Sequence, residues 1–247
     1  MVGAAHAADA ISRARHLPKL RVGLHLTLVE QRPVLPVAEI PDLVDAAGCL
    51  RSDLAGYGAA IMAKPRVRRQ MESEIRAQFE AFRATGLALD HVNAHRHYHL
   101  HPTVLGAILR IGPAFGMGAM RVPNEPISVL RRVDRMARGP LAILLKPWSA
   151  LMSWRVRSAG LAATDCVFGL SWSGGMTQER IAGILRNLPD GRTEIYTHPA
   201  TAACHEGAAR GYLYAKELAA LVSPRCRRAL QESGASLGGY CDLSHKG

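Results

Sequence analysis

LRVGLHLTLV, residues Leu20–Val29, is a mostly apolar run that predicts a buried β-strand. Further segments of strand character follow it along the chain, and segments of helical character lie between them. This alternation favours an α/β fold with a parallel sheet or a (β/α) barrel. The other expected strands are Ala88–Ala94, Ala119–Pro123, Asp165–Leu170, Arg192–Thr197 and Ser236–Asp242.

Apolar spacing predicts the helices between these strands. Over Val67–Thr85, apolar side chains recur every three or four residues, as in an amphipathic helix. Pro102 suits the first turn of a helix that runs to Ile111. We expect one domain over residues 1–247, with a helical insertion at Ile127–Gly160. Further helices are expected at Thr177–Leu188 and Tyr212–Ser233.

Composition limits the class of protein. The chain has 247 residues, of which 48% are hydrophobic and 21% charged, which excludes disordered and fibrous classes. Its five cysteines form no CxxC pair and are expected to be free thiols of a reducing compartment. We find no signal peptide and no membrane-spanning run. The expected localisation is cytoplasmic, with peripheral contact to the cytoplasmic membrane face left open.

Basic charge concentrates in one segment. Residues 131–157 carry a net charge of +6 out of the chain's +11. Within them lies PLAILLKPWSALMSW, Pro140–Trp154, a Leu-rich run with two tryptophans. Such a run suits an interfacial membrane segment, here Leu141–Trp154, and suits equally a core helix pair with basic ends. Nucleic acid is not an expected partner, because no recognised binding motif accompanies the charge.

Histidines form the main candidate site. The segment HVNAHRHYHLH, His91–His101, places its histidines on one face if it is extended throughout. His25 lies in the first strand, and His198 ends the strand-like TEIYTHPA. Histidines at the carboxyl ends of parallel strands would meet on the face where α/β barrels keep their active sites. Together they favour a metal hydrolase site, since neutral imidazole is a common ligand for zinc.

Each histidine also has a simpler interpretation. His25 alone would suit a hydrogen-bonded core histidine, and His198 before Pro199 could cap a strand. The His91–His101 run alone could be a metal-storage tract. A hydrolytic zinc ion needs about three protein ligands, an open position, a base for the attacking water and a proton donor for the leaving amine.

Several segments, in order along the chain, resemble the YdjC family of carbohydrate deacetylases, and most closely its hopanoid-biosynthesis (HpnK) branch. The family has a (β/α)-barrel-like fold and removes N-acetyl groups from amino sugars with a divalent metal ion. The matching segments are RVGLHLTLVEQRPVLP (Arg21–Pro36), LDHVNAHRHYHLHPTV (Leu89–Val104), RVPNEP (Arg121–Pro126), TEIYTHPA (Thr193–Ala200) and LGGYCDL (Leu237–Leu243).

The resemblance implies roles for individual residues. His25 and His95 would be ligands of one divalent ion, zinc before magnesium, and His198 would protonate the leaving amine. Asn93 stands where many relatives have Asp, so a hydrogen-bonding role suits it better than that of a base. The residues expected to line the site as substrate contacts or support for the ligands are His91, Asn93, His97 and Arg121.

The chain departs from the family at its beginning. Relatives start with a strand that ends in an Asp-Asp-Phe-Gly motif, which supplies a third ligand and a base, whereas this chain has no Asp-Asp pair. The resemblance starts at the end of the second family strand, so we expect the first strand-helix unit and most of the second strand to be absent. A shortened gene product and a pseudoenzyme both explain this.

The expected activity is metal-dependent removal of the N-acetyl group from an N-acetylglucosamine-type sugar, on a hopanoid glycolipid by the branch resemblance. Two alternatives stay open: an impaired family member that binds a sugar or lipid, and another barrel amidohydrolase. The expected partners are an N-acetylated sugar or glycolipid, the membrane surface through Leu141–Trp154, and a second copy in a homodimer.

Overall fold

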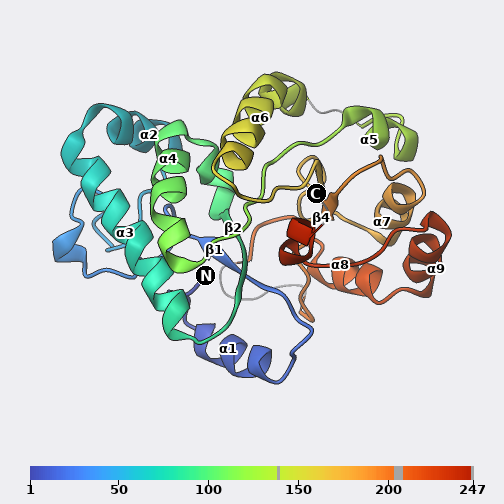
Figure 1. Ribbon diagram of the computed structural model, residues 1–247, viewed down its shortest axis with the longest axis horizontal. Coiled ribbons are helices and arrows are strands. Elements are labelled where there is room, and N and C mark those ends of the chain that lie inside the picture. The colour runs from blue at the N-terminus through green and yellow to red at the C-terminus, as the bar shows by residue number, and fades with distance from the viewer. Residues whose placement is uncertain (138–139, 203–207, 246–247) are drawn as a thin grey trace. The chain divides into compact units, whose positions relative to one another are not determined.

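The computed structural model describes residues 1–137, 140–202 and 208–245 and has a mixed α/β fold (Figure 1). It divides into two compact units, which we describe separately. The first holds Met1–Arg121, Arg155–Ala163 and Gly239–Gly247, and the second holds Val122–Trp154 and Thr164–Gly238. The single domain expected from the sequence stays a prediction.

A two-stranded parallel sheet lies in the first unit. Strand β1 (Val22–Leu26) pairs with β2 (Leu89–Ala94), and the register places His25 opposite Asn93. Single parallel bridges continue from Val92 to Met120 and from Ala119 to Ala162. Segments that follow one another in the chain are therefore neighbours, the order that a (β/α) barrel uses. A closed barrel is not formed within the described residues and stays a prediction.

The first unit also contains several helices, which alternate with its strands along the chain. The amphipathic helix α3 (Pro65–Ala84) confirms the prediction for Val67–Thr85, and its apolar side chains Met71, Ile75 and Phe79 are fully buried. Burying each such side chain stabilises the fold by about 1.5–3 kcal/mol. The predicted helix from Pro102 is α4 (Pro102–Ile111). The remaining elements are α1 (Ala7–Arg15), α2 (Leu54–Ala63) and the 3₁₀ turns η1 (Val37–Glu39), η2 (His95–Leu100), η3 (Gly112–Phe115) and η4 (Tyr240–His245).

The second unit has its own parallel pair and its own core. Strand β3 (Cys166–Phe168) pairs with β4 (Thr193–Ile195), where longer strands are predicted. The buried carboxylate of Glu125 accepts hydrogen bonds from the backbone N–H groups of residues 169–171, which follow β3. The helices are α5 (Ile127–Val133), α6 (Pro140–Ser158), α7 (Gln178–Leu185), α8 (Tyr214–Leu221) and α9 (Pro224–Ser233).

Three predictions about elements are wrong. The strand expected at Ser236–Asp242 is absent; Tyr240 instead begins η4, because the carboxylate of Asp90 binds backbone N–H groups there. The helix expected over Tyr212–Ser233 is broken into α8 and α9, because Ser223 caps a new helix that starts with Pro224. Ala119–Pro123 contributes only isolated bridges.

The histidine run also departs from the extended form considered above. β2 ends at Ala94, and Arg96 and His97 adopt positive φ angles of 54° and 52°. His91 and Asn93 therefore share a strand face, while the residues after His95 turn away from the strand direction in η2.

Candidate functional site

A hydrogen bond joins β1 to β2 at the centre of the candidate site. The ring Nδ1 of His25 donates to Oδ1 of Asn93 at 2.5 Å. The parallel register explains the contact, because it sets His25 directly opposite Asn93. Burial lowers the pKa of His25 to about 3, so its imidazole is neutral near pH 7. Its Nε2 makes no hydrogen bond with the described residues.

The same strand face continues with His91. Its Nδ1 donates to the buried carboxylate of Asp90 at 2.9 Å, and its Nε2 accepts from Nδ2 of Asn93 at 3.3 Å. The ring stacks on Tyr240, with centroids 4.5 Å apart. His91 thus links a buried carboxylate to the residue that holds His25.

His95 follows β2 directly and is held by a different carboxylate. Its Nε2 donates to Oε2 of Glu30 at 3.0 Å. Glu30 also accepts from the guanidinium of Arg96, at 2.8 Å in the shortest contact. That guanidinium is the main cause that lowers the pKa of Glu30, so the carboxylate is ionised near pH 7.

Backbone strain concentrates around this contact. Among the described residues other than glycine, Glu30, Arg96 and His97 have positive φ angles, of 68°, 54° and 52°. Side chains with a Cβ rarely adopt this region, and such outliers cluster at functional sites. Glu30 follows the end of β1 by four residues, and Arg96 and His97 follow the end of β2 by two and three residues.

His25 and His95 lie close enough to share a ligand. Their ring centroids are 5.8 Å apart and the rings meet edge to face. Two imidazoles on one tetrahedral zinc ion, with Zn–N near 2.0 Å, have centroids about 5 Å apart. The pair therefore fits part of a metal site. Within the part of the chain that the structure describes, no three His, Cys, Asp or Glu side chains are arranged to hold an ion.

Arg121, His97 and His99 belong to the same unit. Arg121 is buried, and its backbone N–H donates to the carbonyl of Val92 in β2. The His97 and His99 rings are 5.8 Å apart, and His99 is fully buried. Burial, then the charges of His97 and Arg121, keep the pKa of His99 well below its usual value. His99 is thus a neutral core imidazole.

His198 lies in the second unit, three residues after β4. Its backbone N–H donates to the carboxylate of Glu217, which is fully buried and also accepts from the backbone of Met176. Its ring packs edge to face on Tyr212, with centroids 5.0 Å apart. These contacts fix His198 at the end of a parallel strand, the kind of position that the sequence predicts.

The structure thus brings His25, His91, Asn93 and His95 together in the first unit. The sequence interpretation missed Glu30 and Asp90, although both follow or adjoin apolar strand residues and Asp90 precedes a histidine. It also missed Tyr240, whose LGGYCDL segment carries part of the family resemblance.

The chain is similar in sequence to proteins named as carbohydrate deacetylases. A 243-residue alignment to a carbohydrate deacetylase of Geobacillus stearothermophilus is 26% identical and covers 97% of this chain and 82% of that protein. The human protein of the same name is 27% identical over 98% of this chain and 80% of its own length. A carbohydrate deacetylase of Brevibacillus brevis is 36% identical, over 43% of this chain and 40% of its own.

The fold has a solved counterpart. The crystal structure of a putative cellobiose-phosphate cleavage protein from Enterococcus faecalis superimposes with a TM-score of 0.73 over 98% of this chain and 85% of that one, at 22% identity. A family model described as "YdjC-like protein" matches residues 1–232. The HpnK branch stays a prediction, but the resemblance at the level of the family is confirmed: this chain belongs to the YdjC-like protein family.

Proposed function

We propose that this chain is a carbohydrate N-deacetylase that hydrolyses the N-acetyl group of an N-acetylglucosamine-type sugar. The reaction breaks the amide C–N bond, gives the carbonyl carbon a water oxygen, and releases acetate and a free amine. The observation that carries the proposal is the pair of imidazoles, His25 and His95, each held by a hydrogen bond at the end of a parallel strand. The names of the family relatives support the substrate class.

One divalent ion is proposed as the cofactor, zinc in preference to magnesium, with His25 and His95 as its ligands. The chemistry that such an ion supplies when bound is Lewis-acid polarisation of the amide carbonyl. Asn93 orients the ring of His25, and Glu30 orients the ring of His95. Both contacts keep a chosen ring nitrogen protonated and leave the other one with its lone pair.

Other residues are assigned to the sugar and to proton transfer. His198 is the proposed donor to the leaving nitrogen, in a backbone position held by Glu217. His97 and Arg121 are proposed substrate contacts. The buried guanidinium of Arg121 suits binding of sugar hydroxyl or acetyl oxygens.

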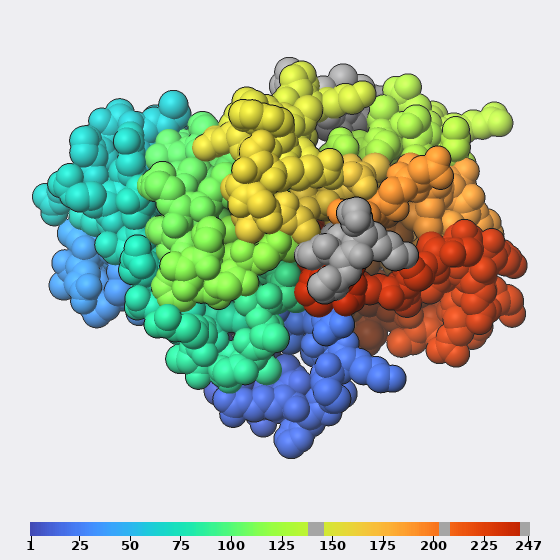
Figure 2. Space-filling view, in the orientation of Figure 1, coloured from blue at the N-terminus to red at the C-terminus, as the bar shows by residue number. Residues whose placement is uncertain are grey.

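A glycolipid of the hopanoid class, presented at a membrane surface, is the proposed natural substrate. Support comes from α6, where Leu151 and Trp154 are 46% and 64% exposed and Lys146 is exposed too. In Figure 2, residues 146–158 of this helix, in yellow, lie on the face turned to the viewer. Part of the expected segment, 141–145, has side chains outside the described residues. No described helix is long and apolar enough to cross a bilayer.

Product analysis tests the proposed reaction. The chain, incubated with an N-acetylglucosamine oligosaccharide and zinc, is expected to release acetate and free amine in equal amounts. Binding of the sugar without acetate release would favour the alternative of an impaired binder. Ring opening without an amine product would favour another amidohydrolase reaction.

A further inference from the structure

We propose that Asp90 is a positioning residue which, through His91 and Asn93, fixes the tautomer and ring orientation of His25. The chain of hydrogen bonds leaves Nε2 of His25 as the ring's electron-pair donor. This inference rests on the proposed function, in which His25 binds the ion, but the hydrogen-bond chain itself can be tested without any ion.

With neutral imidazoles, the hydrogen bonds from Asp90 to His25 can run in only one direction from donor to acceptor. The Asp90 carboxylate can only accept, so Nδ1 of His91 carries the proton of their 2.9 Å contact. Nε2 of His91 is then an acceptor and takes a hydrogen bond from Nδ2 of Asn93. The amide oxygen of Asn93 is left to accept from Nδ1 of His25.

The reverse direction is disfavoured. It would need a doubly protonated His91, whose Nε2 would donate to the amide oxygen of Asn93. The amide nitrogen of Asn93 would then donate to Nδ1 of His25 and move the proton of His25 to Nε2. The short 2.5 Å separation favours the amide oxygen on the side of His25, and the longer 3.3 Å separation favours the amide nitrogen on the side of His91.

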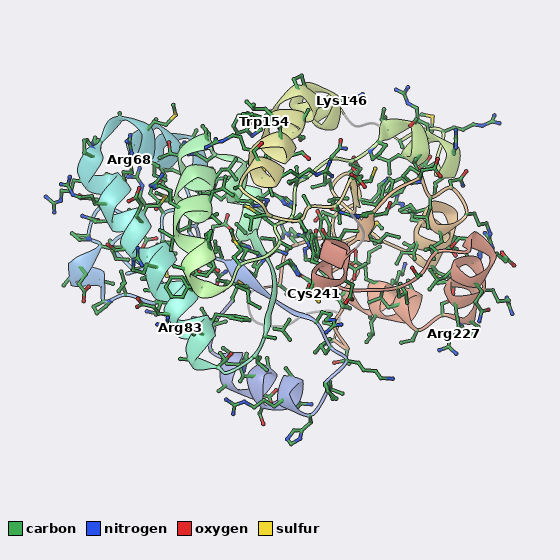
Figure 3. The ribbon with its side chains drawn as sticks, in the orientation of Figure 1. Arg68, Arg83, Lys146, Trp154, Arg227 and Cys241 are labelled. Atoms are coloured by element: carbon green, nitrogen blue, oxygen red, sulfur yellow. The ribbon has the colours of Figure 1, made fainter. Side chains whose placement is uncertain are left out.

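Asp90, the first residue in this series of hydrogen bonds, is rigidly held. Asp90 is 6% exposed and accepts hydrogen bonds from the backbone N–H groups of Tyr240 and Cys241, at 3.1 and 3.0 Å. Cys241, labelled in Figure 3, lies in the C-terminal turn η4. Burial raises the pKa of Asp90, but hydrogen bonds from Cys241, His91 and Tyr240 outweigh it and leave the pKa lowered. The C-terminal segment therefore keeps a carboxylate ionised beneath the histidine site.

His91, the second residue in this series of hydrogen bonds, is held from two sides. One face of the His91 ring stacks on Tyr240, at an interplanar angle of 24°. A Cβ added to Gly23 would lie 2.6 Å from Cε1 of His91, so only glycine leaves room for the ring over β1. The imidazole of His91 has little freedom to rotate, and its hydrogen bonds keep their direction.

The tautomer of His25 is measurable by nitrogen NMR of the full ¹⁵N-labelled chain at pH 7 without metal, with His25→Gln to assign the signal. We expect Nδ1 to be protonated and Nε2 to be unprotonated in the wild type. His91→Phe keeps the stacking on Tyr240 but breaks the chain, and Asp90→Asn keeps the volume but removes the obligatory acceptor. Both variants are expected to give mixed tautomers at His25.

Zinc affinity of the full chain, measured by titration calorimetry, is the second readout. Loss of partners that orient a ligand typically weakens metal binding by about 10–100-fold, and we expect a loss in that range for both variants. Glu74→Gln is the matched control, because Glu74 is a fully buried carboxylate of the same unit that holds the backbone of Val34 and Leu35. It should change neither readout, and thermal melts report folding of each variant.

The outcomes separate the two proposals. Two results would overturn the positioning role of Asp90. One is a His25 protonated at Nε2 in the wild type; the other is an unchanged His25 tautomer in His91→Phe and Asp90→Asn when both variants fold. If the tautomers behave as expected but the wild type binds no zinc, the chain of hydrogen bonds stands and the metal part of the proposed function fails. If His91→Phe folds and Asp90→Asn does not, the His91→Phe result alone decides.

Discussion

Nε2 of His95 lies 3.0 Å from Oε2 of Glu30, a residue 65 positions earlier in the chain. Glu30 holds this position with a φ angle of 68°, and Arg96 braces the same carboxylate. A strained residue four positions after the end of β1 thus reaches a histidine directly after β2, so that the segments following the two strands are connected through side chains.

Replacement of this carboxylate tests its role. In Glu30→Gln the side chain keeps its size, but the ionised acceptor for His95 is lost. We expect deacetylation to fall by about 10–100-fold, because the ring of His95 loses the partner that orients it. Acetate release at saturating zinc measures the effect. Glu72→Gln removes another carboxylate–arginine pair of the first unit, that with Arg110, and should leave the rate unchanged.

The space beside His91 depends on a glycine. Gly23→Ala places a Cβ at 2.6 Å from the His91 ring, so the ring or strand β1 must shift. We expect the free energy of unfolding to fall by about 1–3 kcal/mol, as for other overpacked sites. Urea denaturation measures it. Gly118→Ala is the control, because its added Cβ would meet nothing within 4 Å; equal losses in both variants would contradict the close approach.

Stability should depend on pH through Glu74. Burial raises the pKa of this carboxyl above its ordinary value of 4.5, so the folded state favours its protonated form. The stabilisation is full below the unfolded-state pKa and is lost as the pH rises through the folded-state pKa. Urea midpoints from pH 4 upward should therefore show an added decline in the wild type that Glu74→Gln lacks. Parallel pH profiles for the two proteins would show that the pKa is not raised.

The exposed side chains of α6 give a prediction about membranes. Lys146 and Trp154, labelled in Figure 3, belong to this helix. Trp154→Ser, alone or with Leu151→Ser, is expected to lower cosedimentation with anionic vesicles, and added salt should lower the binding of the wild type. Leu237→Ser is the control, because Leu237 is 83% exposed and lies outside α6. Equal binding by all variants would argue against a membrane role for this helix.

Much of the fold follows from local patterns. The apolar period of α3 and the proline that begins α4 predict both helices closely, because each pattern records which face is buried. The break between α8 and α9 also has a local signal, the Ser223–Pro224 pair. The prediction of one continuous helix gave more weight to the helical pattern on either side of this pair. His25, Asn93 and His95 follow from residue type and resemblance.

The missed features depend on contacts that are distant in sequence. Glu30 becomes part of the site only because a left-handed turn aims it at His95, and no local pattern encodes that angle. The backbone N–H groups of Tyr240 and Cys241 donate to Asp90, 150 and 151 residues away, and these hydrogen bonds favour a 3₁₀ turn over the expected strand. Such tertiary hydrogen bonds override local preference and cannot be read from periodicity.

The most direct test of the account is acetate release from an N-acetylglucosamine oligosaccharide, measured with zinc for the wild type, His25→Ala, His95→Ala and His16→Ala. His16 is exposed at the end of α1 and serves as the matched control. We predict that the wild type and His16→Ala release acetate and free amine equally. His25→Ala and His95→Ala should each lose more than about 100-fold, since loss of a ligand costs at least as much as loss of its partner. Full acetate release by either of these two variants would contradict the assignment of the histidine pair as the reaction centre.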